Sequence, residues 1–404
     1  RDRACRPQLQ ACMSSQRSAF IPYGRQTITD EDIAAVVEVL RSPFLTQGPA
    51  VPAFEQAVAE RVEVTYAVAV NSATSALHIA CLALGLGPGD RLWTSPITFV
   101  ASANCGRYCG AEVDFVDIDP ATGLISVTAL AEKLEQAEHQ GTLPKVVVPV
   151  HLTGSSCDMA AIGALAERYG FAVLEDASHA IGGEYRGEPV GNCRHSAVTV
   201  FSFHPVKIIT TGEGGLATTN DSQLAQRMAE LRSHGIVREM ERFEQPPTGP
   251  WAYEQQQLGF NYRMTDLQAA LGLSQLQRLA EIVTERNRQL ECYRKLLQGL
   301  AAQLLDIPEG VRSAVHLAVV LLMEATPVQH RQVFEGLRET GFGVHMHYSP
   351  VHLQPYYRRL GFCEGDYPAA EAYSTTAISL PLYPGLSFKD QTRVIRTLTE
   401  LMEA

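Results

Sequence analysis

Short apolar segments alternate with helical patterns along most of this chain, and no other feature constrains its fold as strongly. Six of these segments are predicted to be strands: 66–70, 91–94, 113–116, 146–150, 172–175 and 197–202. Helical patterns lie between most of them. The alternation predicts an α/β fold with a doubly wound, mostly parallel sheet. Because ligands bind such sheets beyond the carboxyl ends of the strands, functional residues are expected there.

The pattern changes near residue 240, where a polar loop with three prolines is expected over 240–253. One long, bent helix is predicted after it, followed by a strand, a helix, a strand and a last helix: 264–297, 315–323, 328–339, 343–347 and 389–402. We therefore expect a disordered extension (1–19), a large domain (20–262), and a long helix with a smaller C-terminal α/β domain (263–404). Before the first strand, Thr29 is expected to cap a helix with Ile33 and Leu40 on its apolar face.

Composition excludes several classes of protein. The 404 residues include 33 Lys and Arg against 44 Asp and Glu, for a net charge of −11, and 46% are apolar. An acidic chain is a poor match for nucleic acid, and no run of 18 apolar residues exists to span a membrane. Nine cysteines without a C-x-x-C pair favour neither a disulfide framework nor a zinc site. A reducing, cytoplasmic setting is therefore expected.

Lys207 is the first candidate for chemistry, in the segment 201–215 (FSFHPVKIITTGEGG). Only five lysines are present, and this one is flanked by Val206 and Ile208. Apolar surroundings disfavour the charged amine, and a neutral amine can attack a carbonyl to form a Schiff base. The plain alternative is a lysine whose stem lies on apolar surface with its head in water. On Lys207 alone, that alternative is favoured.

Two further segments gain meaning beside it. An apolar strand ends in Glu175 and Asp176, and a buried carboxylate needs a cationic partner such as a protonated pyridine nitrogen. The turn 71–74 (NSAT) links a strand to a helix, and free N–H groups at a helix start suit a phosphate. Each could instead be an ordinary cap. The glycines over 85–89 follow a helix rather than a strand, so a dinucleotide loop is not indicated.

Together the three segments supply an amine nucleophile, a partner for a pyridinium and a phosphate site. Pyridoxal 5′-phosphate requires that combination. The conjunction is far more specific than any one of its members. We therefore predict a cofactor-binding large domain with Lys207 as the catalytic residue.

Four motifs then resemble a known family over about 20–402: 71–77 (NSATSAL), 175–180 (EDASHA), 201–207 (FSFHPVK) with 212–215 (GEGG), and 259–266 (GFNYRMTD). They are similar to the nucleotide-sugar aminotransferases of the DegT/StrS type, which are fold-type I enzymes dependent on pyridoxal phosphate. Within that family, 71–77, the Ser-His pair after Asp176, and 344–354 are most similar to the 4-aminotransferases of pseudaminic acid synthesis.

The resemblance implies roles for matching residues. Lys207 would form the Schiff base, and Asp176 would keep the pyridine nitrogen protonated. His179 would donate to the cofactor's 3-oxygen, although many relatives have Gln there. Phe99 would stack on the ring. The remaining implied contacts are with phosphate, from Ala73, Thr74 and Ser202 and, in the neighbouring subunit of a homodimer, from Asn261.

For the substrate, the resemblance implies contacts from Tyr23, Pro43, Phe44, Leu45, Thr46, His347 and Tyr348. A metal site among His345, His347 and His352 is not expected, because no carboxylate or cysteine stands at ligand spacing. The implied reaction moves an amino group from L-glutamate, leaving 2-oxoglutarate, to C-4 of a UDP-linked 2-acetamido-2,6-dideoxy-4-ketohexose of the L-arabino configuration.

Three alternatives stay open. Related enzymes aminate C-3 or C-4 of other nucleotide-linked ketosugars, and fold alone does not choose among them. Sugar 3-dehydratases of the family lack the lysine, so Lys207 favours transamination. A regulatory relative that keeps the fold without activity would have little reason to retain Lys207 and Asp176.

Overall fold

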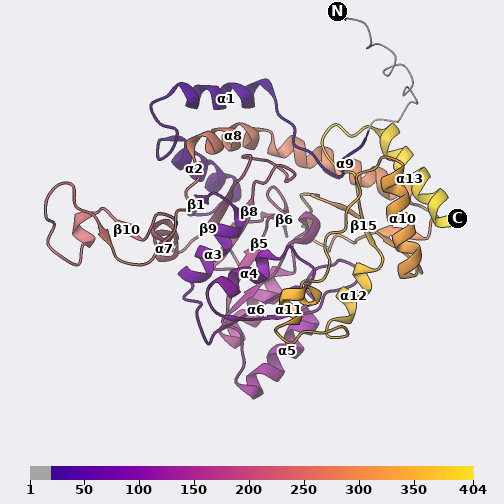
Figure 1. Cartoon of the computed structure of the whole chain (residues 1–404), viewed down its shortest axis with the longest axis horizontal. Coiled ribbons are helices and arrows are strands. Elements are labelled where there is room, and N and C mark those ends of the chain that lie inside the picture. Colours follow the sequence, from indigo (N-terminus) through magenta and orange to yellow (C-terminus); the bar gives the residue numbers. More distant parts are fainter. Residues whose placement is uncertain (1–19) are drawn as a thin grey trace, which may run out of the picture.

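A seven-stranded sheet forms the centre of the computed structural model, which describes residues 20–404 (Figure 1). The extension predicted over 1–19 lies outside that range. The strands of the central sheet are β1 (Tyr66–Val70), β2 (Arg91–Thr94), β3 (Glu112–Phe115), β4 (Val146–Val148), β5 (Ala172–Asp176), β8 (Val198–Ser202) and β9 (Gly215–Thr219). All six predicted strands are therefore present.

The sheet is mostly parallel, as predicted. Its order is β1-β9-β8-β5-β4-β2-β3, and only β9 pairs antiparallel, with β1 on one side and β8 on the other. The sequence analysis did not predict β9, whose residues are a glycine, a leucine, an alanine and two threonines. It runs back from the loop that follows β8. The Lys207 loop is therefore held between two paired strands.

Seven helices lie between residues 20 and 232, and all except the first cover the faces of this sheet. They are α1 (Asp30–Arg41), α2 (Ala50–Val62), α3 (Ala73–Ala83), α4 (Ala101–Tyr108), α5 (Val127–Gln140), α6 (Met159–Tyr169) and α7 (Ser222–Arg232). Successive strand residues point to opposite faces. Val200 of β8 joins the core with α3, α4 and α7, whereas Phe201 joins the core with α2. Helices on both faces make the sheet doubly wound.

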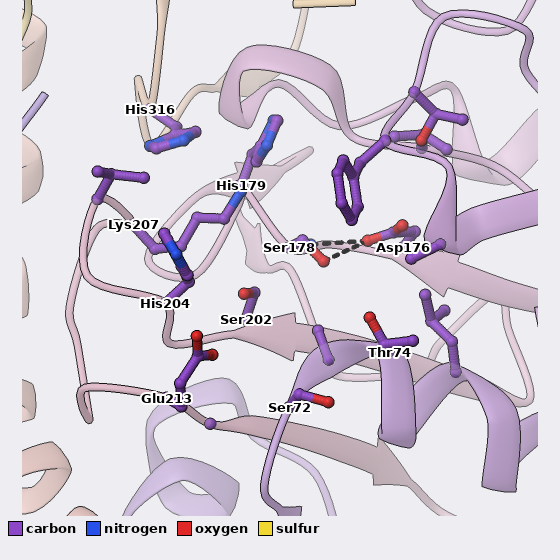
Figure 2. A pocket seen from close by; sticks show the side chains of 18 of the residues that line it. Ser72, Thr74, Asp176, Ser178, His179, Ser202, His204, Lys207, Glu213 and His316 are labelled. Carbon is purple, nitrogen blue, oxygen red and sulfur yellow. Dashed lines mark hydrogen bonds between the residues drawn. The ribbon is translucent and has the colours of Figure 1, made fainter. Parts of the chain in front are cut away.

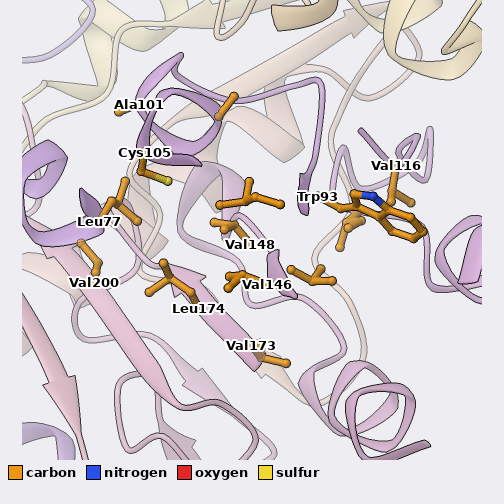
Figure 3. Packing of buried hydrophobic residues seen from close by; sticks show 14 of the residues in the cluster. Leu77, Trp93, Ala101, Cys105, Val116, Val146, Val148, Val173, Leu174 and Val200 are labelled. Carbon is orange, nitrogen blue, oxygen red and sulfur yellow. The ribbon is translucent and has the colours of Figure 1, made fainter. Parts of the chain in front are cut away.

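The larger core fills the space between the sheet and one layer of helices. Figure 3 shows Leu77 and Cys105 from two helices close to Val148, Leu174 and Val200 from three strands. All five side chains are at most 1% exposed. Burial of a side chain of this size stabilises a fold by about 1.5–3 kcal/mol. This packing fixes the strand ends that carry the site.

The predicted long helix after residue 263 is two helices, as its predicted bend indicates. α8 (Asp266–Gln277) and α9 (Leu279–Leu296) meet at Arg278. A second core follows, built on the sheet β12 (Ala302–Leu304), β14 (Ala318–Leu322) and β15 (Ala377–Leu380). Its helices are α9, α10 (Pro327–Glu339) and α13 (Phe388–Glu403), whereas α11 (Pro355–Arg358) and α12 (Pro368–Ser374) pack their buried residues into the larger core. The domain boundary at residue 262 stays a prediction.

One predicted strand, 343–347, is wrong. Phe342 forms a single bridge with Ile21, and His345 forms another with Ser379, so the segment changes partner before a ladder can form. Gly343 also lies where an added Cβ would be 3.0 Å from the Cα of Pro22. The consequence is functional, because the segment turns its next side chains toward the large sheet.

Two small sheets complete the described part of the fold. β6 (Glu184–Tyr185) joins β7 (Glu188–Pro189) and β13 (Val311–Arg312), and β10 (Ile236–Val237) pairs with β11 (Glu254–Gln255). The predicted loop 240–253 lies between β10 and β11 and extends from the body beside α7 (Figure 1). In the part of the chain that the structure describes, no helix is long and apolar enough to cross a membrane.

Thr29 caps α1 as predicted, but the apolar residues of this helix are not its buried face. Asp32 is 0% exposed and receives hydrogen bonds from Ser274, Gln275 and Arg278 of the α8 region. Ile33 and Leu40 are more than half exposed. A polar contact therefore attaches α1 to the body, and its apolar side faces away from it.

Candidate active site

A cavity of about 840 Å³ opens where β5, β8 and β9 meet the start of α3, with further lining residues from the C-terminal part of the chain. Figure 2 shows Lys207 and His179 on one side of this hollow, with Asp176, Ser202 and Thr74 farther along it. This is the expected position beyond the strand ends. The three segments singled out from the sequence therefore come together in space.

Lys207 lies in the loop between β8 and β9, and its backbone N–H donates to the carbonyl of His204 at 2.9 Å. Ile208 and Ile209 behind it are buried. Burial lowers the pKa of the Lys207 amine to about 8, although the negative charge of Asp176 opposes the shift. The neutral amine, which is the form that a nucleophile requires, is therefore far more populated near physiological pH than in an ordinary lysine.

Asp176 ends β5 and lies at the cavity wall, 5% exposed. Its Oδ1 accepts hydrogen bonds from the N–H of Ser178 at 3.1 Å and from the Ser178 hydroxyl at 2.6 Å. The Ser102 hydroxyl donates to Oδ2 at 2.6 Å. Within residues 20–404, no Lys, Arg or His side chain forms an ion pair with this carboxylate. A buried carboxylate held only by neutral donors fits a cationic ligand group.

The end of β1 and the start of α3 form the anion-binding part of the cavity. Ser72 caps α3 by accepting the N–H of Ser75, and the first N–H groups of the helix, those of Ala73 and Thr74, have no acceptor within it. Gly215 of β9 passes so close that an added Cβ would be 2.3 Å from the Ala73 nitrogen. Ser202 completes the lining. This arrangement suits a phosphate.

Histidines and a tyrosine form the opposite wall. The rings of His179 and His316 have centroids 4.4 Å apart, and Tyr348 Oη lies 3.2 Å from His179 Nε2. Burial lowers the pKa of both histidines well below the usual range, with the charge of Lys207 adding to it. Their Nδ1 atoms are buried without a hydrogen-bond partner in the described chain. The wall therefore presents neutral imidazoles and a tyrosine hydroxyl to the cavity.

His347 belongs to the same wall and is directed by the second core. It is 6% exposed, and its Nδ1 lies 2.8 Å from the hydroxyl of Ser379 on β15. Burial, the neighbouring His345 and Lys207 lower the pKa of His347 to about 3. The Tyr23 ring lies 5.2 Å from the His347 ring. A neutral imidazole at this position can hydrogen-bond a polar substrate without carrying charge.

Most predicted site residues line this cavity, and five do not. Ala73, Thr74, Phe99, Asp176, His179, Ser202, Lys207, Tyr23, His347 and Tyr348 line it. Asn261 is exposed, and its backbone bridges to Ser233. The turn Pro43, Phe44, Leu45 and Thr46 lies at the start of α8, where Leu45 O accepts the N–H of Asp266. The structure does not bring these five residues into the cavity of their own chain.

Sequence reasoning missed several residues of the lining, including Ser102's partner Thr98, Glu213, Gln268 and His316. His316 lies two residues before the apolar strand β14, and a histidine beside such a run was the one available signal. Within residues 20–404, no group of three or more His, Cys, Asp or Glu side chains is arranged to hold a metal ion.

Comparison with known proteins identifies the family. The sequence profile described as the DegT/DnrJ/EryC1/StrS aminotransferase family matches residues 26–399. The chain belongs to this family. It is 39% identical to the spore coat polysaccharide biosynthesis protein SpsC of Bacillus subtilis, over 97% of this chain and 99% of that protein. The resemblance to the DegT/StrS type predicted from four motifs is therefore confirmed.

Two further relatives of this DegT/DnrJ/EryC1/StrS chain carry names that describe sugars. A UDP-4-amino-4-deoxy-L-arabinose–oxoglutarate aminotransferase of Shewanella sediminis is 35% identical, over 95% of this chain and 98% of that one. The structure of Helicobacter pylori PseC, an aminotransferase of pseudaminic acid biosynthesis, is 30% identical with a TM-score of 0.86, over 95% and 99% of the two chains.

The protein is thus a sugar aminotransferase of fold-type I that uses pyridoxal 5′-phosphate. The residues present fit that cofactor. The buried Asp176 has no cationic partner in the described chain, Lys207 has a lowered pKa, and the start of α3 is closely approached by a glycine. When bound, the cofactor supplies an electron sink for bond changes at the substrate carbon.

Proposed function

We propose that this enzyme transfers the amino group of L-glutamate to C-4 of UDP-2-acetamido-2,6-dideoxy-β-L-arabino-hexos-4-ulose. The product would be UDP-4-amino-4,6-dideoxy-N-acetyl-β-L-altrosamine, an intermediate of pseudaminic acid biosynthesis. The aminotransferase chemistry rests on one observation. The buried amine of Lys207 lies in the same cavity as the carboxylate of Asp176, which forms no ion pair within the described residues. The choice of sugar is supported by the likeness to PseC.

The chain's own residues would divide the work as follows. Lys207 would hold the cofactor and would accept and return a proton at its Nζ. Asp176 accepts the hydrogen bond of the protonated ring nitrogen. Phe99, 57% exposed toward the cavity, stacks on the ring. Ala73, Thr74 and Ser202 bind the phosphate.

His179 would donate to the 3-oxygen of the cofactor. Its Nε2 lies 3.2 Å from the hydroxyl of Tyr348, so the two side chains can share contact with a ligand oxygen. Burial raises the pKa of Tyr348 far above its usual value, which keeps this hydroxyl a donor. His347 and Tyr23 lie next to it and would contact the sugar. The volume of about 840 Å³ suits a cofactor together with part of a nucleotide sugar.

A homodimer with shared sites is part of the proposal. Asn261 is exposed and absent from the cavity of its own chain, as expected if it serves the phosphate of a partner's cofactor. The turn 43–46 would likewise contact a partner's substrate. Apolar side chains exposed near these segments, among them Leu40, Phe44 and Leu258, support burial against a second copy.

A second candidate is amination at C-4 of a different UDP-linked ketosugar. The named arabinose enzyme is 35% identical to this chain, against 30% for PseC. A non-catalytic relative is disfavoured, because its cavity would have no need of a buried lysine with a lowered pKa beside Asp176.

A substrate panel tests the proposal. Purified enzyme loaded with cofactor receives L-glutamate and, separately, UDP-, dTDP- and GDP-linked 4-ketosugars, and products are identified by mass spectrometry and NMR. We expect the UDP-linked L-arabino 4-ketosugar to be aminated fastest. Faster turnover of the pentose 4-ketosugar would favour the second candidate. Faster turnover of a dTDP- or GDP-linked sugar would contradict the pseudaminic assignment and leave the aminotransferase intact.

A further inference from the structure

We propose that Ser102, supported by Thr98, is a positioning residue that holds the Asp176 carboxylate toward the ring nitrogen of the cofactor. This rests on the role of Asp176 proposed above. Neither Ser102 nor Thr98 was expected from the sequence to belong to the site. Thr98 lies just before α4 and Ser102 in the first turn of that helix, far along the chain from the strand that carries Asp176.

The contact between Ser102 and Asp176 is short and fully buried. Ser102 is 0% exposed, and its hydroxyl donates to Oδ2 of Asp176 at 2.6 Å. Ser178 provides the other two donors, both to Oδ1, but it lies only two residues from Asp176 and moves with the same loop. Ser102 is therefore the group that fixes the carboxylate relative to a separate element. It also occupies the oxygen that Ser178 leaves free.

Thr98 completes a chain of hydroxyl groups. Its Oγ1 lies 2.6 Å from Oγ of Ser102, and Thr98 is 2% exposed. Because the single Ser102 hydroxyl proton points to Asp176, Thr98 must be the donor in the contact between the two hydroxyls. Successive hydrogen bonds of this kind polarise one another. The order Thr98 to Ser102 to Asp176 therefore strengthens the last bond, to the charged carboxylate.

Phe99 lies between these two residues in the same turn. Its side chain is exposed and lines the cavity, whereas the hydroxyl of Ser102 donates to the buried carboxylate and that of Thr98 lies against Ser102. One turn therefore sets both the stacking ring and the carboxylate that faces the ring nitrogen. The hydroxyl groups of Thr98 and Ser102 would therefore determine how the bound cofactor is oriented, and would have less effect on its affinity.

The test uses the full-length holoenzyme and four variants: Ser102→Ala, Thr98→Val, the conservative Ser102→Thr, and Ser178→Ala as the comparison at the other oxygen. Three properties are measured: visible circular dichroism of the bound cofactor, the dissociation constant of pyridoxal phosphate from the apoenzyme, and the single-turnover reaction with L-glutamate alone. The last needs no knowledge of the sugar.

Ser102→Ala should slow the single turnover by about tenfold to a hundredfold, the usual effect of losing a hydrogen bond to a charged group. The visible dichroism should shrink, while KM for glutamate and the cofactor dissociation constant change by less than about threefold. Ser102→Thr should restore most of the rate, and Thr98→Val should lose less than Ser102→Ala. Ser178→Ala should change the visible dichroism less than Ser102→Ala does.

Two results would overturn the proposal. One is a Ser102→Ala enzyme with unchanged rate and dichroism. The other is an equal loss of rate, cofactor affinity and thermal stability without rescue by Ser102→Thr, which indicates packing alone. An Asp176→Asn control separates this from the role of Asp176 itself. If Asp176→Asn keeps the rate, that role fails; if it is inactive while Ser102→Ala is normal, only the present proposal fails.

Discussion

The two sides of the cavity differ in how their polar groups are satisfied. On the side of the strand ends, Asp176 already receives three hydrogen bonds from Ser102 and Ser178. On the side built from the C-terminal part, His316 keeps a buried Nδ1 without a partner in the described chain, as does the adjoining His179. The first side is prepared for one fixed group. The second consists of neutral imidazoles and a tyrosine hydroxyl that line the cavity.

This difference suggests how one fold serves many sugars. A cofactor that never changes is held by groups whose geometry is complete before it binds. A substrate that differs between relatives meets side chains that can accept several patterns of hydroxyl and amide groups.

The largest effect should come from removing the amine. Lys207→Ala should lose turnover by at least about a hundredfold to ten-thousandfold, because proton transfer through a positioned base disappears with it. Lys145→Ala, at an exposed ion pair with Asp90, is the matched control and should retain normal activity. Product formation is followed by mass spectrometry. Normal turnover of Lys207→Ala would show that Lys207 is not the catalytic residue, and the cofactor side of the cavity would lose its assigned role.

The histidine side should affect the sugar rather than the donor. His347→Ala should raise KM for the ketosugar by a factor that corresponds to about 1–3 kcal/mol, since a buried substrate group would lose its hydrogen bond. KM for glutamate should change much less. His345→Ala, at the neighbouring but more exposed imidazole, should have a smaller effect. An equal rise in both KM values would show that the two ligands do not use separate sides.

The pH dependence of cofactor uptake sharpens the account of Lys207. Its pKa is lowered to about 8, so at pH 7 only about one-tenth of the amine is neutral. Attachment of pyridoxal phosphate to the apoenzyme should therefore accelerate about fivefold from pH 7 to pH 8 and level off above about pH 9. Stopped-flow absorbance measures the rate. A rise that continues to pH 10 would mean that the amine is not desolvated.

The lowered pKa of Lys207 also makes the stability of the folded protein depend on pH. The folded apoenzyme binds the Lys207 proton less tightly than the unfolded chain, whose amine has a pKa near 10.5. This residue's contribution to stability therefore increases as pH rises between about 8 and 10.5.

Subunit mixing gives the smallest, most specific signal. Lys207→Ala and Asn261→Ala subunits should each be impaired, and after exchange a heterodimer would contain one intact site if Asn261 serves the partner. Partial recovery of activity is expected. Mixing Lys207→Ala with itself is the control. Recovery that fails although exchange is confirmed by mass would place both residues in the same subunit's site.

Much of the fold could be predicted because strand and helix periods are local. The six large-sheet strands and the bend near Arg278 follow from runs of residues that need no distant partner. β9 was missed because its glycine and threonines become a strand only between β1 and β8. The strand at 343–347 failed for the opposite reason, since its β-like residues change partner after Phe342.

The site residues also differ in whether a local sequence signal identifies them or only long-range packing does. Lys207, Asp176 and the 71–74 turn each have local surroundings that indicate chemistry. Ser102, Thr98 and His316 do not, because hydroxyls and single histidines are common and only long-range packing directs them. Ile33 and Leu40 of α1 look like a core face in the sequence, yet Asp32 makes the contact with the body. Nothing local distinguishes a face meant for the chain's own core from one meant for a partner.

The most direct measurement is to reduce the cofactor-loaded enzyme with borohydride and map the labelled peptide by mass spectrometry. Of the five lysines, Lys133 and Lys145 form ion pairs, Lys295 and Lys389 are exposed, and Lys207 lies in the cavity. The account predicts the phosphopyridoxyl mass on the peptide containing Lys207 and on no other. A label on any other lysine, or a loaded enzyme without label on Lys207, would contradict it.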